Sequence, residues 1–271
     1  MECPFCPDGD PSNHLGINLV SKGLSCWRCG TTGTIITLLK KIEAKPISEV
    51  VNQFSDREIP TEEPTERIIN KSVTSQHISE AIDELLPLHK GWLESRNFEA
   101  DVFDRYRLKC FGPIGRYKHR FLIPFYQHRR LITFTTRDVT NLAKTPYIHC
   151  PTEDSVIEPK RYLYNLNSVK DTAIIVEGPT DVWRIGDGCV ATMGITYMVE
   201  QLALLKNRGV SRAFFMFDFE KFAQDAAEEF SYAASTFIPH VEVIELDEGD
   251  PADLTITDVK SLRKDIFGKY F

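Results

Sequence analysis

The sequence AIIVEGPTD at residues 173–181, together with AFFMFDFE at residues 213–220, determines the fold that we expect for this chain. In each stretch, a short and almost wholly apolar run is followed at once by carboxylates. Such runs are typical of strands that are covered on both faces, as in parallel sheets flanked by helices. The carboxyl ends of parallel strands meet at one edge of the sheet, where ligands bind. We therefore expect Glu177, Asp218 and Glu220 to lie together.

The residues around these two stretches continue the pattern. Further strands are expected over 189–192 and 241–246, and helices are expected through residue 185 and over 197–207 and 223–236. Alternation of this kind predicts an α/β domain with a mainly parallel sheet and helices on both faces. We place this domain at residues 171–271.

Carboxylates that converge at one edge repel one another unless a cation neutralises them. Oxygen ligands of this kind suit Mg²⁺ or Mn²⁺. Asp250, which follows the last strand, is a further candidate ligand. The alternative is that acidic residues occupy loop ends for solubility, which we accept for Glu248 and Asp258 but not for the set of Glu177, Asp218 and Glu220.

Four of the seven cysteines fall near the start of the chain. Cys3 and Cys6 form one Cys-x2-Cys pair, and Cys26 and Cys29 form a second pair after 19 residues. Two such turns close a tetrahedral zinc site. A redox pair or chance clustering is the alternative. We predict a β zinc ribbon over residues 1–45 that holds one structural zinc ion, with strands over 17–20 and 24–27, while His14 is a loop residue.

Two segments follow the ribbon. A short helix is expected over residues 35–44. Residues 55–75 are rich in acidic residues and proline and contain few large apolar groups, so we interpret residues 46–75 as an extended linker.

Residues 76–170 form a mixed α+β subdomain with a basic character. Residues 105–144 contain ten basic residues and one acidic residue, and aromatic residues are interleaved with them. Strands are expected over 120–125 and 131–134, one hairpin apart. Basic groups attract phosphates and aromatic faces stack on bases, so this is a candidate surface for single-stranded nucleic acid or nucleotides. The alternative is a solvated basic sheet with aromatic residues in its core.

The composition of the whole chain limits the classes of protein to which it can belong. The chain has 271 residues and a formal charge of −7, which argues against coating nucleic acid by bulk charge. No apolar run approaches the length of a membrane span, and the N-terminus lacks the pattern of a secretion signal. We expect a cytoplasmic protein without membrane association, in which disulfides are an unexpected use of the cysteines.

These motifs together resemble a known family. The segment Glu177-Gly178-x2-Asp181, with Asp218-x-Glu220 after a later strand, resembles the TOPRIM domain. A zinc ribbon, a basic subdomain and then TOPRIM is the order found in DnaG-type primases of bacteria and phages. Segments 120–125, 134–137, 147–151 and 162–166 are similar to elements of the primase RNA polymerase domain, and 250–254 is similar to the Asp-Pro-Asp segment of TOPRIM.

The resemblance implies a DNA primase, a nucleotidyltransferase that makes short RNA primers on single-stranded DNA from NTPs. It implies that Glu177, Asp218 and Glu220 hold Mg²⁺ or Mn²⁺ with help from Asp250, that Glu177 also acts as a general acid or base, and that Asp181 supports the site. Nucleotide or template contacts are implied for a basic and aromatic set: Lys118, Arg120, Arg137, Lys144 and Tyr147. A separate replicative helicase is the expected protein partner, because little chain follows TOPRIM.

The sequence departs from the family pattern at three places. Cys6 stands at a position where the commonest bacterial ribbons have histidine, and four cysteines are typical of phage-type ribbons, which favours a phage or mobile-element origin and thus a host cytoplasm. Glu220 replaces the usual second aspartate, and Pro146 replaces a lysine for which Lys144 is the candidate substitute. Two other functions use the same features: a TOPRIM-type nuclease, and a non-catalytic replication protein that binds single-stranded DNA.

Overall fold

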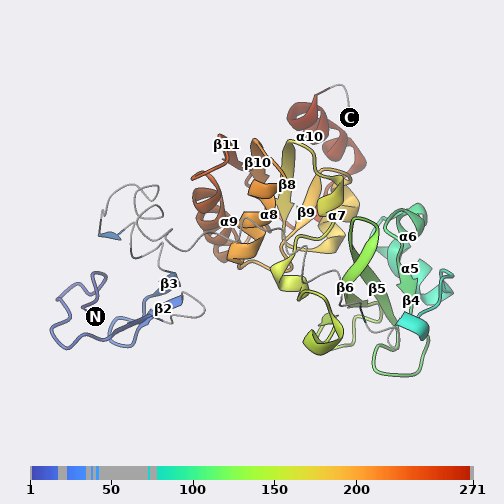
Figure 1. Cartoon of the computed structure of the whole chain (residues 1–271), viewed down its shortest axis with the longest axis horizontal. Coiled ribbons are helices and arrows are strands. Elements are labelled where there is room, and N and C mark those ends of the chain that lie inside the picture. Colours follow the sequence, from blue (N-terminus) through green and yellow to red (C-terminus); the bar gives the residue numbers. More distant parts are fainter. Residues whose placement is uncertain are drawn as a thin grey trace. The chain divides into compact units, whose positions relative to one another are not determined.

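The computed structural model describes residues 2–17, 23–34, 38, 41–42, 73 and 78–268. The chain divides into two compact units, residues 1–59 and 60–271, and each is described by itself (Figure 1). The predicted linker over 46–75 lies outside the described residues except for Val73, and so does most of the predicted helix over 35–44. The predicted domain boundaries therefore remain predictions.

The first unit is a small antiparallel sheet. Its strands follow the order β1 (Leu15–Ile17), β2 (Gly23–Cys26) and β3 (Thr32–Thr34). The strand predicted over 24–27 is β2, whereas β1 begins at Leu15 and residues 18–20 lie outside the described part. The buried apolar side chains described here are few: Cys3, Leu15, Leu24, Cys26 and Leu38. So small a core supplies little stability, and a second source of folding free energy is required.

The second unit begins with an antiparallel sheet and two helices. Helices α5 (Pro87–Ser95) and α6 (Asp101–Arg105) precede the strands β4 (Lys109–Cys110), β5 (Arg120–Gln127), β6 (Arg130–Asp138) and β7 (Tyr147–His149), which pair in that order. The predicted hairpin is β5–β6, with Gln127 opposite Arg130 at its turn. Three short 3-10 turns, η1 (Thr152–Asp154), η2 (Pro159–Arg161) and η3 (Leu166–Ser168), lead to the second sheet.

The second sheet confirms the α/β prediction. Its strands are β8 (Thr172–Val176), β9 (Cys189–Ala191), β10 (Arg212–Phe215) and β11 (His240–Val243), in the spatial order β11-β10-β8-β9, and every pairing is parallel. Helices α8 (Val199–Asn207) and α9 (Lys221–Ala234) lie on one side, and α7 (Pro179–Ile185) and α10 (Ile256–Phe267) on the other (Figure 1). The residues of β8 from Ala173 to Val176 are fully buried, as their apolar run predicts.

The two sheets of the second unit share one core. Phe121 of β5 packs edge-to-face on Trp183 of α7, with ring centroids 6.2 Å apart. The Tyr106 hydroxyl donates a hydrogen bond to the carbonyl of Val182 at 3.0 Å. A single buried cluster runs from Trp92 to Ile266 through both sheets, so the basic subdomain and the parallel sheet form one packed body. No helix in the described part of the chain combines the length and the apolar character that crossing a membrane requires.

Candidate functional site

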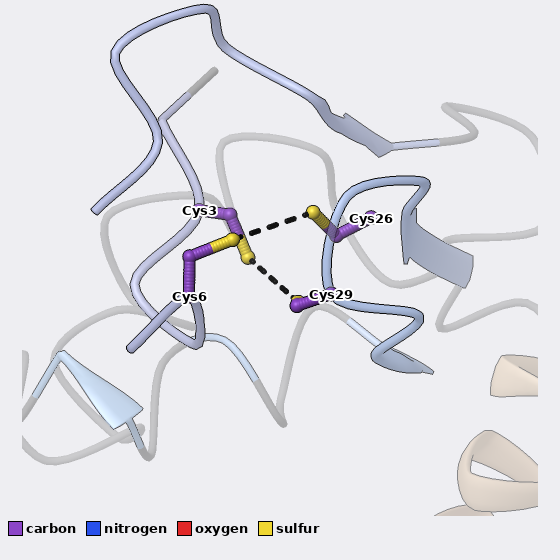
Figure 2. Close-up of side chains that lie close together, drawn as sticks. All are labelled: Cys3, Cys6, Cys26 and Cys29. Atoms are coloured by element: carbon purple, nitrogen blue, oxygen red, sulfur yellow. Dashed lines mark hydrogen bonds between the residues drawn. The ribbon is translucent and has the colours of Figure 1, made fainter. Parts of the chain in front are cut away.

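The two cysteine pairs meet in the first unit. Figure 2 shows the side chains of Cys3, Cys6, Cys26 and Cys29 pointing toward one another from two turns. Their four Sγ atoms all lie within 4.8 Å of one another, and the pairs Cys3–Cys29 and Cys6–Cys26 are each 3.8 Å apart. In a tetrahedron with Zn–S bonds of about 2.3 Å, neighbouring sulfurs are about 3.8 Å apart. The donor set and its spacing therefore fit one structural zinc ion.

A buried carboxylate supports the first cysteine turn. Asp10 is fully buried, and its Oδ2 accepts hydrogen bonds from the backbone N–H groups of Cys3 at 3.0 Å and His14 at 2.6 Å. Burial alone raises the pKa of Asp10, but the hydrogen bonds from the side chain and backbone of His14 and from Cys3 bring this pKa below its usual value. The His14 ring contacts Asp10 through Nδ1. His14 therefore supports this carboxylate and is not one of the four clustered ligands.

The acidic edge of the parallel sheet is the second site. We use this term for Glu177, Asp218, Glu220 and Asp250. Glu177 follows β8, and Asp218 lies beyond the neighbouring strand β10. The backbone N–H of Asp218 donates a hydrogen bond to Glu177 Oε1 at 3.1 Å. Glu220 is the N-cap residue of α9, and Asp250 is the N-cap residue of η4 (Pro251–Asp253).

Like charges and burial perturb this edge. Burial, followed by the charges of Glu177, Asp250 and Glu220, raises the pKa of Asp218 to about 7. Burial also raises the pKa of Glu177, and Glu220 and Asp250 add to this rise. The Oδ1 atom of Asp250 is buried and has no hydrogen-bond partner within the part of the chain that is described. A bound cation relieves the repulsion and supplies the missing partner, so these residues fit a divalent metal site.

The carboxylates of the acidic edge are less tightly clustered than the cysteines. Among the described residues, the cysteines form the one cluster of three or more ligating side chains that all lie within 4.8 Å. No three carboxylates of the acidic edge come that close to one another. Mg²⁺ retains several of its waters and binds through one or two carboxylates, which is compatible with this wider spacing.

Asp181 lies beside the acidic edge at the start of α7. Its side chain is 4% exposed, and its Oδ2 accepts a hydrogen bond from the N–H of Gly178 at 2.8 Å. Burial, with added repulsion from Asp250, raises the pKa of Asp181 well above its usual value. The side chain thus fixes the turn that carries Glu177, as a residue at the third helical position does when it reaches back to the cap.

Lys160 is a residue near the site that the sequence analysis missed. Its Nζ donates hydrogen bonds to the carbonyls of Thr192 at 3.4 Å, Met193 at 3.1 Å and Gly194 at 3.3 Å. The N–H of Gly194 donates to the carbonyl of Glu177 at 3.0 Å. Burial lowers the pKa of Lys160 to about 8, and the charge of Glu177 partly opposes this. The lysine thus brings a positive charge toward the acidic edge.

The predicted nucleotide-binding residues occupy different environments. Arg120 is 5% exposed, and its terminal nitrogens donate hydrogen bonds to the carbonyls of Pro146 and Thr145, each at 2.8 Å. Its guanidinium therefore holds the loop before β7, and its role in binding a nucleotide stays a prediction. The Arg137 guanidinium lies over the rings of Trp92 at 5.6 Å and Tyr147 at 5.0 Å.

The other predicted nucleotide-binding residues differ in whether they lie near the acidic edge. Tyr147 interacts with Thr180 and Asp181 at the start of α7, so the Arg137–Tyr147 pair borders the site. Lys118 and Lys144 are exposed, and no described contact brings them to the acidic edge.

Comparison with known proteins gives a match at the level of fold. No protein-family model matches the chain, and no curated protein sequence does either. The zinc-binding and RNA polymerase domains of the Aquifex aeolicus primase superpose with a TM-score of 0.59 at 19% identity, covering 98% of this chain and 77% of that one. The RNA polymerase domain of Mycobacterium tuberculosis primase DnaG gives 0.58 at 16% identity, covering 76% and 84%. A DnaG primase catalytic domain bound to single-stranded DNA gives 0.52 at 19% identity, covering 67% and 70%.

The chain has the fold of DnaG-type primases. The resemblance found in the sequence and the predicted fold class are therefore confirmed. Within the primase fold, the motif at residues 177–181 lies at the end of β8 and the start of α7, and the segment at 250–254 contains η4.

Proposed function

We propose that this protein is a DNA primase that makes short RNA primers on single-stranded DNA by metal-dependent nucleotidyl transfer. The observation that carries the proposal is the hydrogen bond between the Asp218 N–H and Glu177 Oε1, which joins two carboxylate-bearing strand ends in a primase fold. A DnaG catalytic domain with the same fold binds single-stranded DNA, which supports a DNA template for this chain.

Glu177, Asp218, Glu220 and Asp250 would hold Mg²⁺ or Mn²⁺ at the acidic edge. A metal held there would lower the pKa of an attacking 3′-hydroxyl and would stabilise charge on the reacting phosphate and the pyrophosphate. Glu177 has a raised pKa and stands at the centre of the edge, so it is also suited to accept or return a proton.

Other residues would bind the substrate or hold the backbone around the acidic edge. Lys160 directs an ammonium group toward Glu177 and is placed to offset phosphate charge. Asp181 fixes the turn at Gly178, and the Arg137–Tyr147 pair borders the start of α7. The four-cysteine ribbon, folded around zinc, is proposed to help select the template sequence.

A polymerisation assay separates this function from its rivals. The protein is incubated with single-stranded DNA, labelled NTPs and Mg²⁺ or Mn²⁺, beside the variants Glu177→Gln and Asp218→Asn and a control, Glu228→Gln, on an exposed position of α9. Short RNA products that both site variants lose and the control keeps are the expected result. Shortened DNA without NTP incorporation indicates a nuclease, and DNA binding with neither product indicates a non-catalytic protein.

A further inference from the structure

A pocket lies beside β9, an edge strand of the parallel sheet. Its volume is about 390 Å³. Two hydrogen bonds place it at the start of β9: Asn165 Nδ2 donates to the carbonyl of Cys189, and the N–H of Gly188 donates to Ser168 Oγ, each at 3.0 Å. None of the four residues of the acidic edge lines the pocket, so the pocket and the acidic edge are separate sites.

The charged side chains that line the pocket are all positive. Arg105, Arg107 and Arg129 line it with exposed side chains, and no aspartate or glutamate belongs to its lining. Arg105 has an ion pair with Asp187 at 3.4 Å, but both side chains are about half exposed, at 47% and 56%, so this pair competes weakly with a ligand. The Arg107 guanidinium lies over the ring of Tyr126, 5.1 Å from its centre. A cationic rim thus stands beside an aromatic face.

Backbone strain is concentrated around the same pocket. Nine non-glycine residues of the described chain have positive φ angles, and four of them line this pocket: Arg107 (52°), His128 (48°), Arg129 (68°) and Asn165 (63°). Positive φ is uncommon outside glycine and asparagine. Residues held in such conformations cluster where their side chains have a function.

Two of these four residues form the turn between β5 and β6. His128 and Arg129 form a two-residue hairpin loop with positive φ at both positions. Turns of this kind strongly favour Asn-Gly. The chain instead places a histidine and an arginine there, at a cost in stability, and both side chains line the pocket.

We propose that this pocket binds a nucleotide unit, with its phosphate held by Arg105, Arg107 and Arg129 and its base stacked beside Tyr126. Guanidinium groups bind phosphate through paired hydrogen bonds, and bases stack on aromatic rings and guanidinium planes. The volume falls in the range of small-ligand sites. The nucleotide belongs either to single-stranded nucleic acid or to a free nucleoside triphosphate. The site lies apart from the acidic edge and holds no catalytic group, so it exists whether or not the chain makes primers.

Fluorescence anisotropy tests this proposal on the full chain without added Mg²⁺. The probes are a fluorescein-labelled oligothymidylate and a fluorescent ATP analogue. The pocket variant is Arg105→Gln/Arg107→Gln/Arg129→Gln, and the control Lys90→Gln/Lys206→Gln/Lys260→Gln removes the same charge from exposed positions elsewhere. We expect the pocket variant to bind at least one probe about tenfold more weakly, and the control to stay within about twofold of the wild type. For the oligonucleotide, the magnitude of the slope of log K against log salt should fall by about 0.7, because the variant loses one phosphate contact and about 0.7 counterions are released per phosphate contact on single strands.

The probe whose binding is lost identifies the source of the nucleotide. Equal effects of the two triple variants, or no effect of either, overturn the proposal. A single variant, Arg129→Gly, separates binding from folding, because glycine suits the turn. Its melting temperature should match or exceed that of the wild type while affinity falls about threefold, and unchanged affinity contradicts the proposal. Glu177→Gln, which abolishes primer synthesis if the proposed function holds, should leave binding at this pocket intact.

Discussion

The backbone N–H of Asp218 donates a hydrogen bond to Oε1 of Glu177 across 3.1 Å, and this contact joins the ends of two neighbouring parallel strands. Each carboxylate lies next to the other in a partly buried setting, so each is destabilised in its charged form. A bound divalent cation would relieve this repulsion, and the predictions about this site follow from that.

Neutralising either carboxylate should abolish metal-dependent chemistry without unfolding the chain. Glu177→Gln and Asp218→Asn are expected to lower any Mg²⁺-dependent primer synthesis by about 100-fold or more, since each removes a charged metal ligand. Melting temperatures should stay at or above that of the wild type, because each change removes repulsion. Activity within a factor of two of the wild type would place the chemistry elsewhere.

The stability of the metal-free protein should fall as the pH rises from about 4 to about 7. The pKa of Asp218 is about 7 in the folded chain, whereas an unperturbed aspartate has a pKa of about 3.9. The folded state therefore binds more protons than the unfolded state in this window, and the free energy of unfolding decreases with pH. Urea unfolding at several pH values measures this slope.

Asp218→Asn should flatten that slope, and added Mg²⁺ should restore stability at neutral pH. Asp225→Asn, at an exposed position of α9, is the control and should leave the slope unchanged. The same slope in all three proteins would show that Asp218 ionises normally.

The cysteine cluster should hold about one zinc ion, and removing that ion should unfold the ribbon alone. With a core of a few side chains, the first unit depends on metal binding for its folding free energy. Elemental analysis measures the metal, and hydrogen exchange after chelation should show lost protection at 2–34 but not at 78–268. Cys150→Ala, which removes a cysteine outside the cluster, should keep the zinc, and a zinc-free ribbon that stays folded contradicts this account.

Arg120 should act on stability and not on nucleotide affinity. Its guanidinium is buried and donates to the carbonyls of Thr145 and Pro146. Arg120→Ala is expected to lower the free energy of unfolding by about 2–3 kcal/mol, because two carbonyls lose a charged donor. Arg120→Lys should rescue this only in part, since one ammonium cannot reproduce the planar fork. Chemical unfolding and NTP titration measure the two effects, and a weakened NTP affinity at unchanged stability restores the role first expected from the sequence.

The sequence predicted the parallel sheet well because β8, β9 and most of β10 are buried on both faces. The run from Ala173 to Val176 has no polar residue. It therefore predicts a strand buried on both faces, whichever way its side chains alternate. The cysteine spacing was equally informative, because four thiolates at short intervals have few other uses.

Other features depend on tertiary contacts that no local pattern contains. Arg120 lies in a strand beside apolar residues, and nothing in its neighbours reveals that its guanidinium would be buried against a loop 25 residues away. Lys160 is carried by a 3-10 turn, and its role arises from three carbonyls more than 30 residues away. Strand β3 is the three-residue run Thr-Gly-Thr; threonine favours strands but glycine does not, and the run has no apolar residue that would reveal a buried face.

Direct analysis of reaction products tests the central claim, that the acidic edge of a primase fold makes RNA on a DNA template. The full chain is incubated with circular single-stranded DNA, four NTPs of which one is labelled, and Mg²⁺ or Mn²⁺, and the products are separated on a sequencing gel. The account predicts short, alkali-labile products that need both template and metal and that Glu177→Gln does not form. Labelled product without template, or no product with either metal while the protein is folded and zinc-loaded, would contradict it.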